Sequence, residues 1–373
     1  MDGSPRPVSL KGFAYQPVAR HGVEIWRGDE AERLSPAMLP DYLYDPDGPS
    51  AAPYVDGYDQ FGWLWQNHRL VVPKPALVKL TNVSVLKRSL GRNRYHIVLD
   101  EGVCARDSYH DGRWLGPHIG ETVKLGTDGF DLTVNIMDDA PIDARVKQPC
   151  ILASHFWAEN YAHTLLETAG RFKAIEMAPN VADYPIIWDT PNAWQKELAE
   201  MLAPGRVKPM PHNHVRFDTL LVPSFGISRA SVNWLQKRFG DQGPPGTRRI
   251  YVTRADATER RVKNEEEVEK VLKSKGFETV MLTGMTVAEQ RALFRDVEIA
   301  VMPHGAGCAN MVFAGKGAKF LEFVPRSYQH HMFWRIAKWL DQWYGRIVCF
   351  DDENKDMQVD ITVLNCGLEA AGL

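Results

Sequence analysis

Short apolar runs separated by turn residues dominate positions 68–140, whereas strand and helix patterns alternate from position 150 onward. In the first region, runs such as ALVKLTNVSVL (76–86) and FDLTVNIMD (130–138) predict strands. At the start of the second region, CILAS (150–154) predicts a buried strand, and residues 159–177 predict one long helix. The folded part therefore begins with a β-rich layer and continues as an α/β protein.

After position 177 the strand and helix patterns keep alternating. The expected strands are 184–189, 217–223, 248–253, 279–282, 298–302 and 319–324. The expected helices are 193–202, 228–239, one beginning at Asn264, one beginning at Thr286, and 330–344. This alternation predicts parallel sheets with helices on both faces.

Three local signals refine the later helices. Asn264 with Glu267, and Thr286 with Glu289, fit the spacing of a capping box, in which two side chains at a helix start bond each other's backbone. Gly276 fits the position after a helix end, where a positive φ is favourable.

The chain divides at DQGPPG (241–246), whose Pro and Gly content is typical of a linker. We expect two α/β lobes with a cleft between them. The expected limits are an irregular segment (1–58), a first lobe with a β-rich start (59–243), a second, Rossmann-like lobe (244–345) and a C-terminal tail (346–373).

Composition excludes several classes of protein. The 373 residues carry a formal net charge of -3, which disfavours non-specific nucleic-acid binding. No stretch approaches the roughly 18 apolar residues of a membrane helix, and the N-terminus lacks a secretory signal core. The five cysteines are widely spaced and form no CxxC, so we expect a reducing compartment, no disulfide framework and no zinc site.

A glycine loop follows the strand expected at 298–302: His304-Gly305-Ala306-Gly307-Cys308-Ala309-Asn310. Ligands of open α/β sheets bind at the carboxyl ends of strands, and a helix start with free N–H groups favours an anion. The loop lacks the third glycine of the dinucleotide fingerprint and the Lys-Ser/Thr of a P-loop, which disfavours NAD and ATP hydrolysis. A phosphate site and a plain tight turn both remain open.

Arginines gather after the strand expected at 248–253. Arg254, Arg260 and Arg261, followed by Asn264 and Glu265, lie at the same expected sheet edge as the glycine loop. A charge-assisted hydrogen bond contributes about 1.5–3 kcal/mol, whereas a helix-end field contributes about 0.3–2 kcal/mol. The arginines would therefore set the affinity for a diphosphate, unless they form an ordinary solvated loop.

Polar residues also recur along the helix expected at 159–177. His163, Glu167 and Arg171 are spaced i, i+4, i+8, which places them on one helical face, where a carboxylate can orient an imidazole. The alternative is that these three residues form the solvent-exposed face of an ordinary helix. Glu322, within the apolar strand KFLEFVP, fits either a strand-end acceptor for ribose hydroxyls or a structural ion pair.

Asp45-Pro46-Asp47 formally matches a D-x-D metal signature of some sugar transferases. Its Pro and the following Gly favour a turn. We therefore expect no catalytic metal and no cofactor.

Several ordered motifs together resemble glycosyltransferase family 61. They are NYAHTLLE (160–167), the R-R-x-x-N-E element from Arg260 to Glu265, Glu289-Gln290, HGAGxxNxxF from His304 to Phe313, and LEFVP (321–325). The resemblance covers roughly 148–330. The segment TAGRF (168–172) departs from the family pattern. Relatives often carry a Leu-Pro-Arg-Leu-like run here, and this chain keeps the arginine, Arg171, but not the proline.

The resemblance implies a GT-B fold with two Rossmann-like lobes, and inverting, metal-independent transfer of a hexosyl or pentosyl group from a nucleotide-diphosphate sugar, most simply UDP-linked. This chain is similar to bacterial-type members that build surface polysaccharides. The implied donor-binding residues are Arg254, Arg260, Arg261, Asn264, Glu265, His304, Gly305, Ala306, Gly307, Asn310 and Glu322. The implied acceptor-binding residues are Asn160, Tyr161 and Arg171.

The expected general base is His163, with Glu167 orienting it, and the reverse assignment remains open. The expected partners are a UDP-sugar and a glycan or lipid-linked glycan, with no nucleic acid. The expected location is cytoplasmic, with peripheral membrane contact if the acceptor is a lipid. One rival hypothesis is a protein that binds a nucleotide sugar or glycan without catalysis. The other is an epimerase-type or α/β hydrolase-like enzyme, which is disfavoured because the sequence contains no G-x-S-x-G elbow.

Overall fold

The structure is a computed structural model in which part of the chain is described. The described residues are 6–9, 24–27, 41–44, 46, 76–89, 93–98, 124–125, 132–136, 142–154, 159–176, 178, 180–223, 227–240, 243–330 and 332–373. The run HRLVVP (68–73), Asp45, Asp47 and most of the segment 1–58 lie outside these residues.

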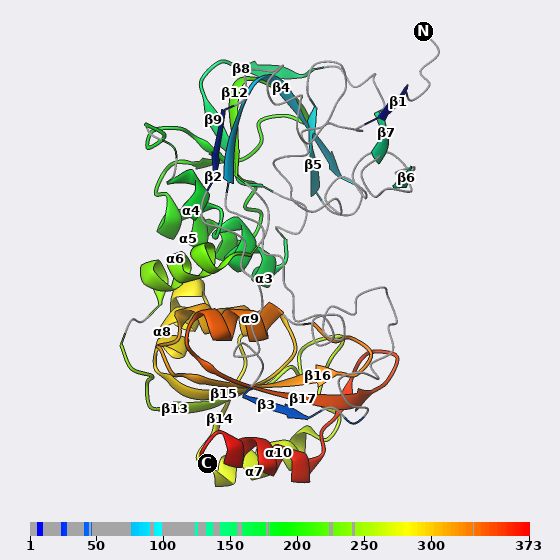
Figure 1. Ribbon diagram of the computed structural model, residues 1–373, viewed down its shortest axis with the longest axis vertical. Helices are drawn as coiled ribbons and strands as arrows, with labels where there is room; N and C mark the ends of the chain where they lie inside the picture. The colour runs from blue at the N-terminus through cyan, green and yellow to red at the C-terminus, as the bar shows by residue number, and fades with distance from the viewer. Residues whose placement is uncertain are drawn as a thin grey trace. The chain divides into compact units, whose positions relative to one another are not determined.

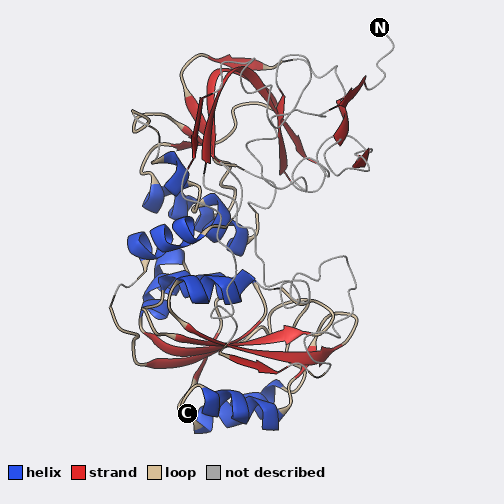
Figure 2. Ribbon diagram, in the orientation of Figure 1, coloured by secondary structure: helices blue, strands red, loops and turns tan. Residues whose placement is uncertain are grey.

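Two compact units make up the chain. The first consists of Met1–Ala31 with Pro73–Ser231, and the second of Glu32–Val72 with Val232–Leu373. The domain limits expected from the sequence stay predictions. Both units combine helices and sheets, so the α/β class is confirmed (Figure 2).

The first unit contains a mixed sheet in the order β11-β10-β9-β12-β4-β2, with β5 paired to β4 and β8 to β12. Its strands are β2 (Glu24–Arg27), β4 (Ala76–Ser89), β5 (Asn93–Val98), β8 (Ala144–Val146), β9 (Cys150–Leu152), β10 (Ile186–Ile187), β11 (Val207–Lys208) and β12 (His214–Pro223). β9 to β12 pair in parallel, whereas β4 is antiparallel to β12. An entirely parallel sheet in this unit is therefore wrong, because the long β4 of the β-rich start joins it. A separate antiparallel sheet contains β1 (Arg6–Ser9), β7 (Leu132–Ile136) and β6 (Lys124–Leu125).

The helices of this half of the chain follow β9 and β10. They are α3 (Tyr161–His163), the π-helix η4 (Thr164–Thr168), α4 (Phe172–Ile175), α5 (Ala193–Leu202) and α6 (Arg229–Phe239), within which the division between the units falls. The sequence predicts a single helix over 159–177, and the structure corrects this to three short segments. The backbone N–H of Ala169 donates to the carbonyl of Thr164 at 2.9 Å, five residues back, so the helix widens by one residue per turn here.

The second unit contains a sheet in the order β14-β13-β15-β16-β17-β18, with β3 paired to β17. Its strands are β3 (Tyr42–Tyr44), β13 (Arg248–Val252), β14 (Glu278–Val280), β15 (Val297–Pro303), β16 (Lys319–Pro325), β17 (Trp343–Asp351) and β18 (Met357–Gln358). All neighbours pair in parallel except β17 and β18. The order of the first five strands is that of a doubly wound fold, as the alternation predicts.

Helices cover both faces of this second sheet. They are α7 (Glu265–Ser274), α8 (Val287–Arg295), the 3-10 helix η5 (Ala306–Phe313), α9 (Met332–Trp339) and α10 (Ile361–Ala370). Figure 1 shows α8 and α9 on one face of the sheet and α7 and α10 on the other. β15 and β16 are almost entirely buried, which is why their sequences are continuous apolar runs rather than alternating ones.

The end of the chain belongs to this sheet. The helix expected at 330–344 stops at Trp339, and Asp341 adopts a positive φ of 53°, which turns the chain into β17. The segment expected to be a tail supplies most of β17, together with β18 and α10, and Leu364 and Leu368 pack into the core on the α7 side. Among the described residues, no helix combines the length and apolar character needed to cross a bilayer.

Candidate active site

The imidazole of His163 and the carboxylate of Glu167 form a pair in the first unit. The two side chains are joined by Nδ1 of His163 and Oε2 of Glu167 at 2.9 Å. The side chain of His163 is 29% exposed and that of Glu167 is 8% exposed. Glu167 is therefore placed to orient the ring, and His163 is the member of the pair that solvent can reach.

Arg171, the third predicted residue of this segment, is buried against the end of β9. It is 3% exposed, and its Nη1 donates to the carbonyls of Ala153 at 3.1 Å and Ser154 at 3.3 Å, at the end of β9. The placement of His163, Glu167 and Arg171 on one helical face stays a prediction. As placed, Arg171 holds the end of a strand, and its role toward an acceptor stays a prediction.

Asn160 and Tyr161 begin the same helical segment. The side-chain carbonyl of Asn160 accepts from the backbone N–H of Ala162 at 2.9 Å and of His163 at 3.4 Å, which is the bonding of an N-cap. The ring of Tyr161 lies 5.4 Å from that of Trp194, between centroids. Asn160 thus fixes where the helix starts and so where His163 lies, and Tyr161 and Trp194 form an aromatic pair one residue from that cap.

A second group of predicted residues follows two neighbouring strands of the second unit. Arg254 comes two residues after β13, and His304 directly follows β15, which pairs with β13 in parallel. The strand order reverses between these two strands, and the crevice at such a switch point is the usual ligand site of open α/β sheets. The sequence expectation that the arginines and the glycine loop share one sheet edge is confirmed.

Arg254 lies directly against the glycine loop. A Cβ atom added at Gly305 would come within 2.2 Å of Nη1 of Arg254, so a glycine is needed at this position for the guanidinium to fit. The φ of Gly305 is 177°, an extended conformation open to any residue, so space and not backbone freedom explains the glycine. A cation thus lies beside the backbone that opens η5.

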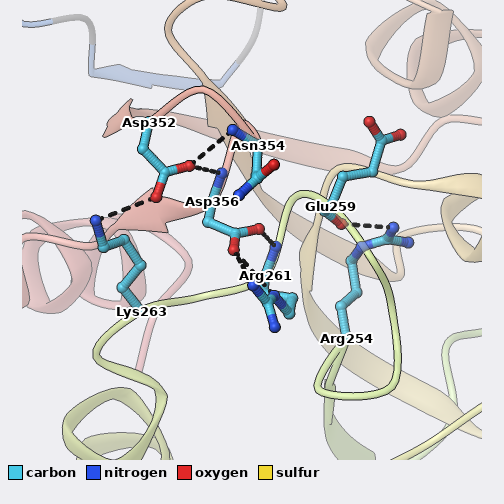
Figure 3. A network of polar contacts seen from close by, with 7 residues as sticks. All are labelled: Arg254, Glu259, Arg261, Lys263, Asp352, Asn354 and Asp356. Atoms are coloured by element: carbon cyan, nitrogen blue, oxygen red, sulfur yellow. Dashed lines mark hydrogen bonds and ion pairs between the residues drawn. The ribbon is translucent and has the colours of Figure 1, made fainter.

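The guanidinium of Arg254 is largely buried next to a second arginine. Nη2 donates to the carbonyl of Glu259 at 3.1 Å, and Nε is buried without a hydrogen-bond partner among the described residues (Figure 3). Burial, followed by the charge of Arg260, lowers the pKa of Arg254. Arginine stays protonated in proteins, so such a site is relieved by an anion rather than by loss of the proton.

The three predicted arginines have different surroundings. Arg260 adopts a positive φ of 59° and pairs with the exposed Glu259 at 2.6 Å. Arg261 is instead engaged by Asp356, which accepts from its Nη2 at 2.6 Å, its Nε at 2.9 Å and its backbone N–H at 2.8 Å. Figure 3 shows this paired arrangement. Arg254 and Arg260 are therefore better placed to meet an anion than Arg261.

Asn264 and Glu265 bond to the protein itself. Asn264 exchanges hydrogen bonds with the backbone of Val359, at 2.8 Å and 3.0 Å, and its side chain bonds the side chain of Glu267 rather than the backbone of the helix start. The capping box expected at Asn264 is therefore wrong, whereas the one at Thr286 and Glu289 is confirmed. Oε1 of Glu265 accepts from the hydroxyls of two β13-side residues, Tyr251 at 2.8 Å and Thr253 at 2.7 Å.

Glu322 connects two buried side chains. Its Oε1 lies 2.5 Å from Nδ1 of His304, and its Oε2 is bonded by the hydroxyl of Tyr344. Glu322 lies in the middle of β16 and not at its end, and both of its oxygens have protein partners. This arrangement favours the structural ion-pair alternative over a ribose acceptor, whose role stays a prediction.

His304 is enclosed by aromatic rings and by charge. The centroids of Tyr328, His330 and Phe333 lie 5.6, 5.9 and 5.4 Å from its own. Burial is the main reason that the pKa of His304 is lowered from 6.5; Glu322 opposes the shift, and Arg260 and Arg346 add to it. At neutral pH His304 is therefore an uncharged ring whose Nδ1–H donates to Glu322.

The rest of the glycine loop packs inward. Nδ2 of Asn310 donates to Oε1 of Gln290 in α8 at 2.8 Å, which explains the Glu-Gln element of the sequence: Glu289 caps α8 and Gln290 holds η5. Ala306 and Gly307 are half-buried at the start of η5. Burial raises the pKa of the Cys308 thiol well above 9.0, so this cysteine is no nucleophile.

Sequence reasoning misses four residues around the site. Tyr344, Arg346 and Asp356 come from the segment after 343, and Tyr328 from the loop after β16. Arg346 is fully buried and donates to the carbonyl of His330 and to the side chain of Gln329. One signal could have found it: an arginine within the apolar strand GRIVCF needs buried partners.

No group of three or more His, Cys, Asp or Glu side chains within the described part of the chain has the spacing to hold a metal ion. The Asp45-Pro46-Asp47 signature lies largely outside that part, and the expectation that no metal takes part stays a prediction.

Comparison with known proteins agrees with the motifs. The family model described as Glycosyltransferase 61 matches residues 161–321, a range that contains His163, Glu167, the arginines and the glycine loop. No curated protein matches the chain. From α3 into β16 the chain thus matches the glycosyltransferase 61 family, which supports glycosyltransferase activity.

Proposed function

We propose that the protein is an inverting, metal-independent glycosyltransferase that moves a hexosyl or pentosyl group from a nucleotide-diphosphate sugar, UDP-linked, to a hydroxyl of a glycan, polysaccharide or lipid-linked glycan. The observation that carries the donor class is the buried guanidinium of Arg254 against Gly305, at the switch point of a doubly wound sheet. A diphosphate suits this position because it is negatively charged and its oxygens accept hydrogen bonds from a guanidinium group.

The second step concerns the leaving group. The bond between the anomeric carbon and the diphosphate oxygen breaks, and the nucleoside diphosphate leaves with the bonding electrons. Without a metal, the developing charge has to be met by protein donors: Arg254, Arg260 and the backbone N–H groups that open η5. Arg261 instead holds this loop in position, because its guanidinium already donates hydrogen bonds to Asp356.

The third step concerns the acceptor. Its hydroxyl oxygen attacks the anomeric carbon from the face opposite the leaving group, and the proton passes to His163. His163 rather than Glu167 is the proposed base, because the imidazole is the more exposed member of the pair and the carboxylate bonds its other side. Asn160 and Tyr161 would contact the acceptor. The proposal includes the GT-B arrangement, in which each unit supplies one of the two substrate sites.

The direct test is transfer of radiolabel from a panel of UDP- and GDP-sugars to glycan acceptors, in buffer with EDTA and in buffer with Mn²⁺. We expect transfer in EDTA, with inversion at the anomeric carbon. Activity that requires Mn²⁺ would overturn the metal-independent mechanism. Binding of a nucleotide sugar without transfer or hydrolysis would instead favour the non-catalytic binding protein, and release of a modified nucleotide sugar without acceptor would favour the epimerase-type rival.

A further inference from the structure

Loops after four neighbouring strands of the second sheet come to one edge. Arg254 and Arg260 follow β13, His304 follows β15, Tyr328 follows β16, and Lys355 lies in the turn between β17 and β18. β13, β15, β16 and β17 are parallel neighbours, so their carboxyl ends share that edge. Tyr328 and Lys355 come after residue 321, where the family match ends.

The ring of Tyr328 holds two cations at this edge. Cζ of Arg260 lies 5.5 Å from the ring centroid, and Nζ of Lys355 lies 5.2 Å from it. The ring of His304 meets the same tyrosine edge-on at 5.6 Å. One tyrosine therefore links Lys355 to the arginine and the histidine of the candidate donor site.

Two acidic residues near Lys355, Asp352 and Asp356, are engaged elsewhere. Asp356 bonds Arg261, and Asp352 accepts from Lys263 at 3.2 Å and from the backbone N–H groups of its own turn, as Figure 3 shows. Within the described part of the chain, no ion pair involves Lys355. Two cations therefore meet at Tyr328, and the exposed Glu259 is paired with Arg260.

Both cations belong to residues with an unfavourable backbone conformation. Lys355 has a φ of +60° and Arg260 a φ of +59°, a left-handed conformation that is unfavourable for residues with a Cβ atom. The backbone N–H of Arg260 donates to the carbonyl of Asn354 at 3.2 Å, which ties the two turns together. Strained backbone that the surrounding contacts maintain is common at ligand sites.

We propose that Lys355 is a further donor-binding residue, whose ammonium group binds the diphosphate of the nucleotide sugar together with Arg260. The inference rests on the proposed function. Lysine binds phosphate as a compact point charge. A diphosphate supplies an anion for Lys355, and at Arg260 it would add to or replace the exposed Glu259. The turn between β17 and β18 is then part of the donor site, although it lies outside the family match.

The test measures UDP binding by isothermal titration calorimetry for the whole chain and its variants. Lys355→Met removes the charge and keeps the side-chain length, and Lys355→Gly removes it at a position whose positive φ suits glycine. The matched control is Lys316→Met. Lys316 is an exposed lysine that pairs with Asp341 and lies just before β16, at the end of that strand opposite to the candidate donor site. Arg254→Met reports on the proposed donor site itself.

We expect UDP affinity to fall about tenfold in both Lys355 variants, to stay unchanged in Lys316→Met, and to be largely retained in Lys355→Arg. The thermal unfolding midpoint of Lys355→Gly should not fall, which separates lost binding from lost folding. Binding that weakens in Arg254→Met but not in the Lys355 variants would overturn this inference alone. An equal loss of UDP affinity in Lys316→Met would overturn the inference, because it would show that the loss follows the net charge of the protein and not the position of Lys355. A wild-type protein that binds neither UDP nor GDP would overturn the proposed donor site and this inference together.

Discussion

The guanidinium of Arg254 and the backbone of Gly305 are in contact, and the space between them leaves no room for a methyl group. They come from loops fifty positions apart in the sequence, brought together because β13 and β15 are parallel neighbours. The guanidinium of Arg254 fits at this position because residue 305 has no Cβ atom.

Gly305→Ala should therefore weaken nucleotide binding by displacing the guanidinium. We expect a loss of about ten- to a hundredfold in UDP affinity, the range of one charge-assisted hydrogen bond. Titration calorimetry measures it. Gly205→Ala is the control: no atom lies within 4 Å of its added Cβ, and its φ of +69° lowers stability by about 1 kcal/mol without touching the donor site. Equal UDP affinity in Gly305→Ala and wild type would contradict the placement of the diphosphate at Arg254.

His163→Ala should lower kcat by about 10²- to 10⁴-fold, the usual contribution of a general base, and leave UDP affinity unchanged. Glu167→Gln should lower kcat less, because the amide keeps a hydrogen bond to the ring but loses the charge that supports the imidazolium. Single-turnover assays with saturating donor separate chemistry from binding. His212→Ala, an exposed histidine of the same unit, is the matched control. A smaller loss in His163→Ala than in Glu167→Gln would reverse the assignment of the base.

Asp356 should make the protein sensitive to acid. Burial of its carboxyl opposes ionisation, but the hydrogen bonds from Arg261 outweigh burial and lower the pKa below 3.8. A carboxyl whose pKa is depressed by folding stabilises the protein above its unfolded pKa, and this stabilisation is lost as the pH falls through the folded value. Asp356→Asn should thus lower the unfolding midpoint by a few degrees near pH 7 and by progressively less below pH 3.8.

Thermal unfolding across this pH range measures the effect. The control is Asp341→Asn, in an exposed pair with Lys316 at a position whose φ of +53° suits asparagine, and it should change the midpoint little at any pH. A pH-independent difference between Asp356→Asn and wild type would show that the carboxylate charge has no part in holding this turn.

Tyr344→Phe should destabilise the protein by about 1–3 kcal/mol, because it leaves the buried Oε2 of Glu322 without its donor. Tyr42→Phe is the matched substitution, since the Tyr42 hydroxyl makes one long contact of 3.4 Å to the carbonyl of Val363 and should cost at most about 0.5 kcal/mol. Denaturant unfolding compares the two. Similar losses in both variants would mean that the hydroxyl of Tyr344 contributes no more than an ordinary surface contact.

Local patterns predict helix limits and caps well where their information is contained in a few neighbouring residues. The helix at 193–202 has the predicted limits, and Thr286 with Glu289 forms the expected cap. Predictions fail where a distant segment competes for the same groups. Asn264 bonds Val359, ninety-five positions away, in place of its own helix start. The pattern that predicts a helix to position 344 continues past Trp339, but Asp341 reverses the chain so that Trp343 begins a strand beside β16.

The sequence alone determined the α/β class, the family motifs and the pairing of His163 with Glu167, since each depends on residues within about one helical turn or on the order of apolar runs. Tertiary structure alone decided which partners each predicted arginine has. Arg254, Arg260 and Arg261 are equal in charge and close in sequence, yet Arg261 lies against Asp356, ninety-five residues on, and Arg254 lies against Gly305. Charge is a property of the residue, whereas its availability to a ligand depends on the partners that strand order and packing place beside it.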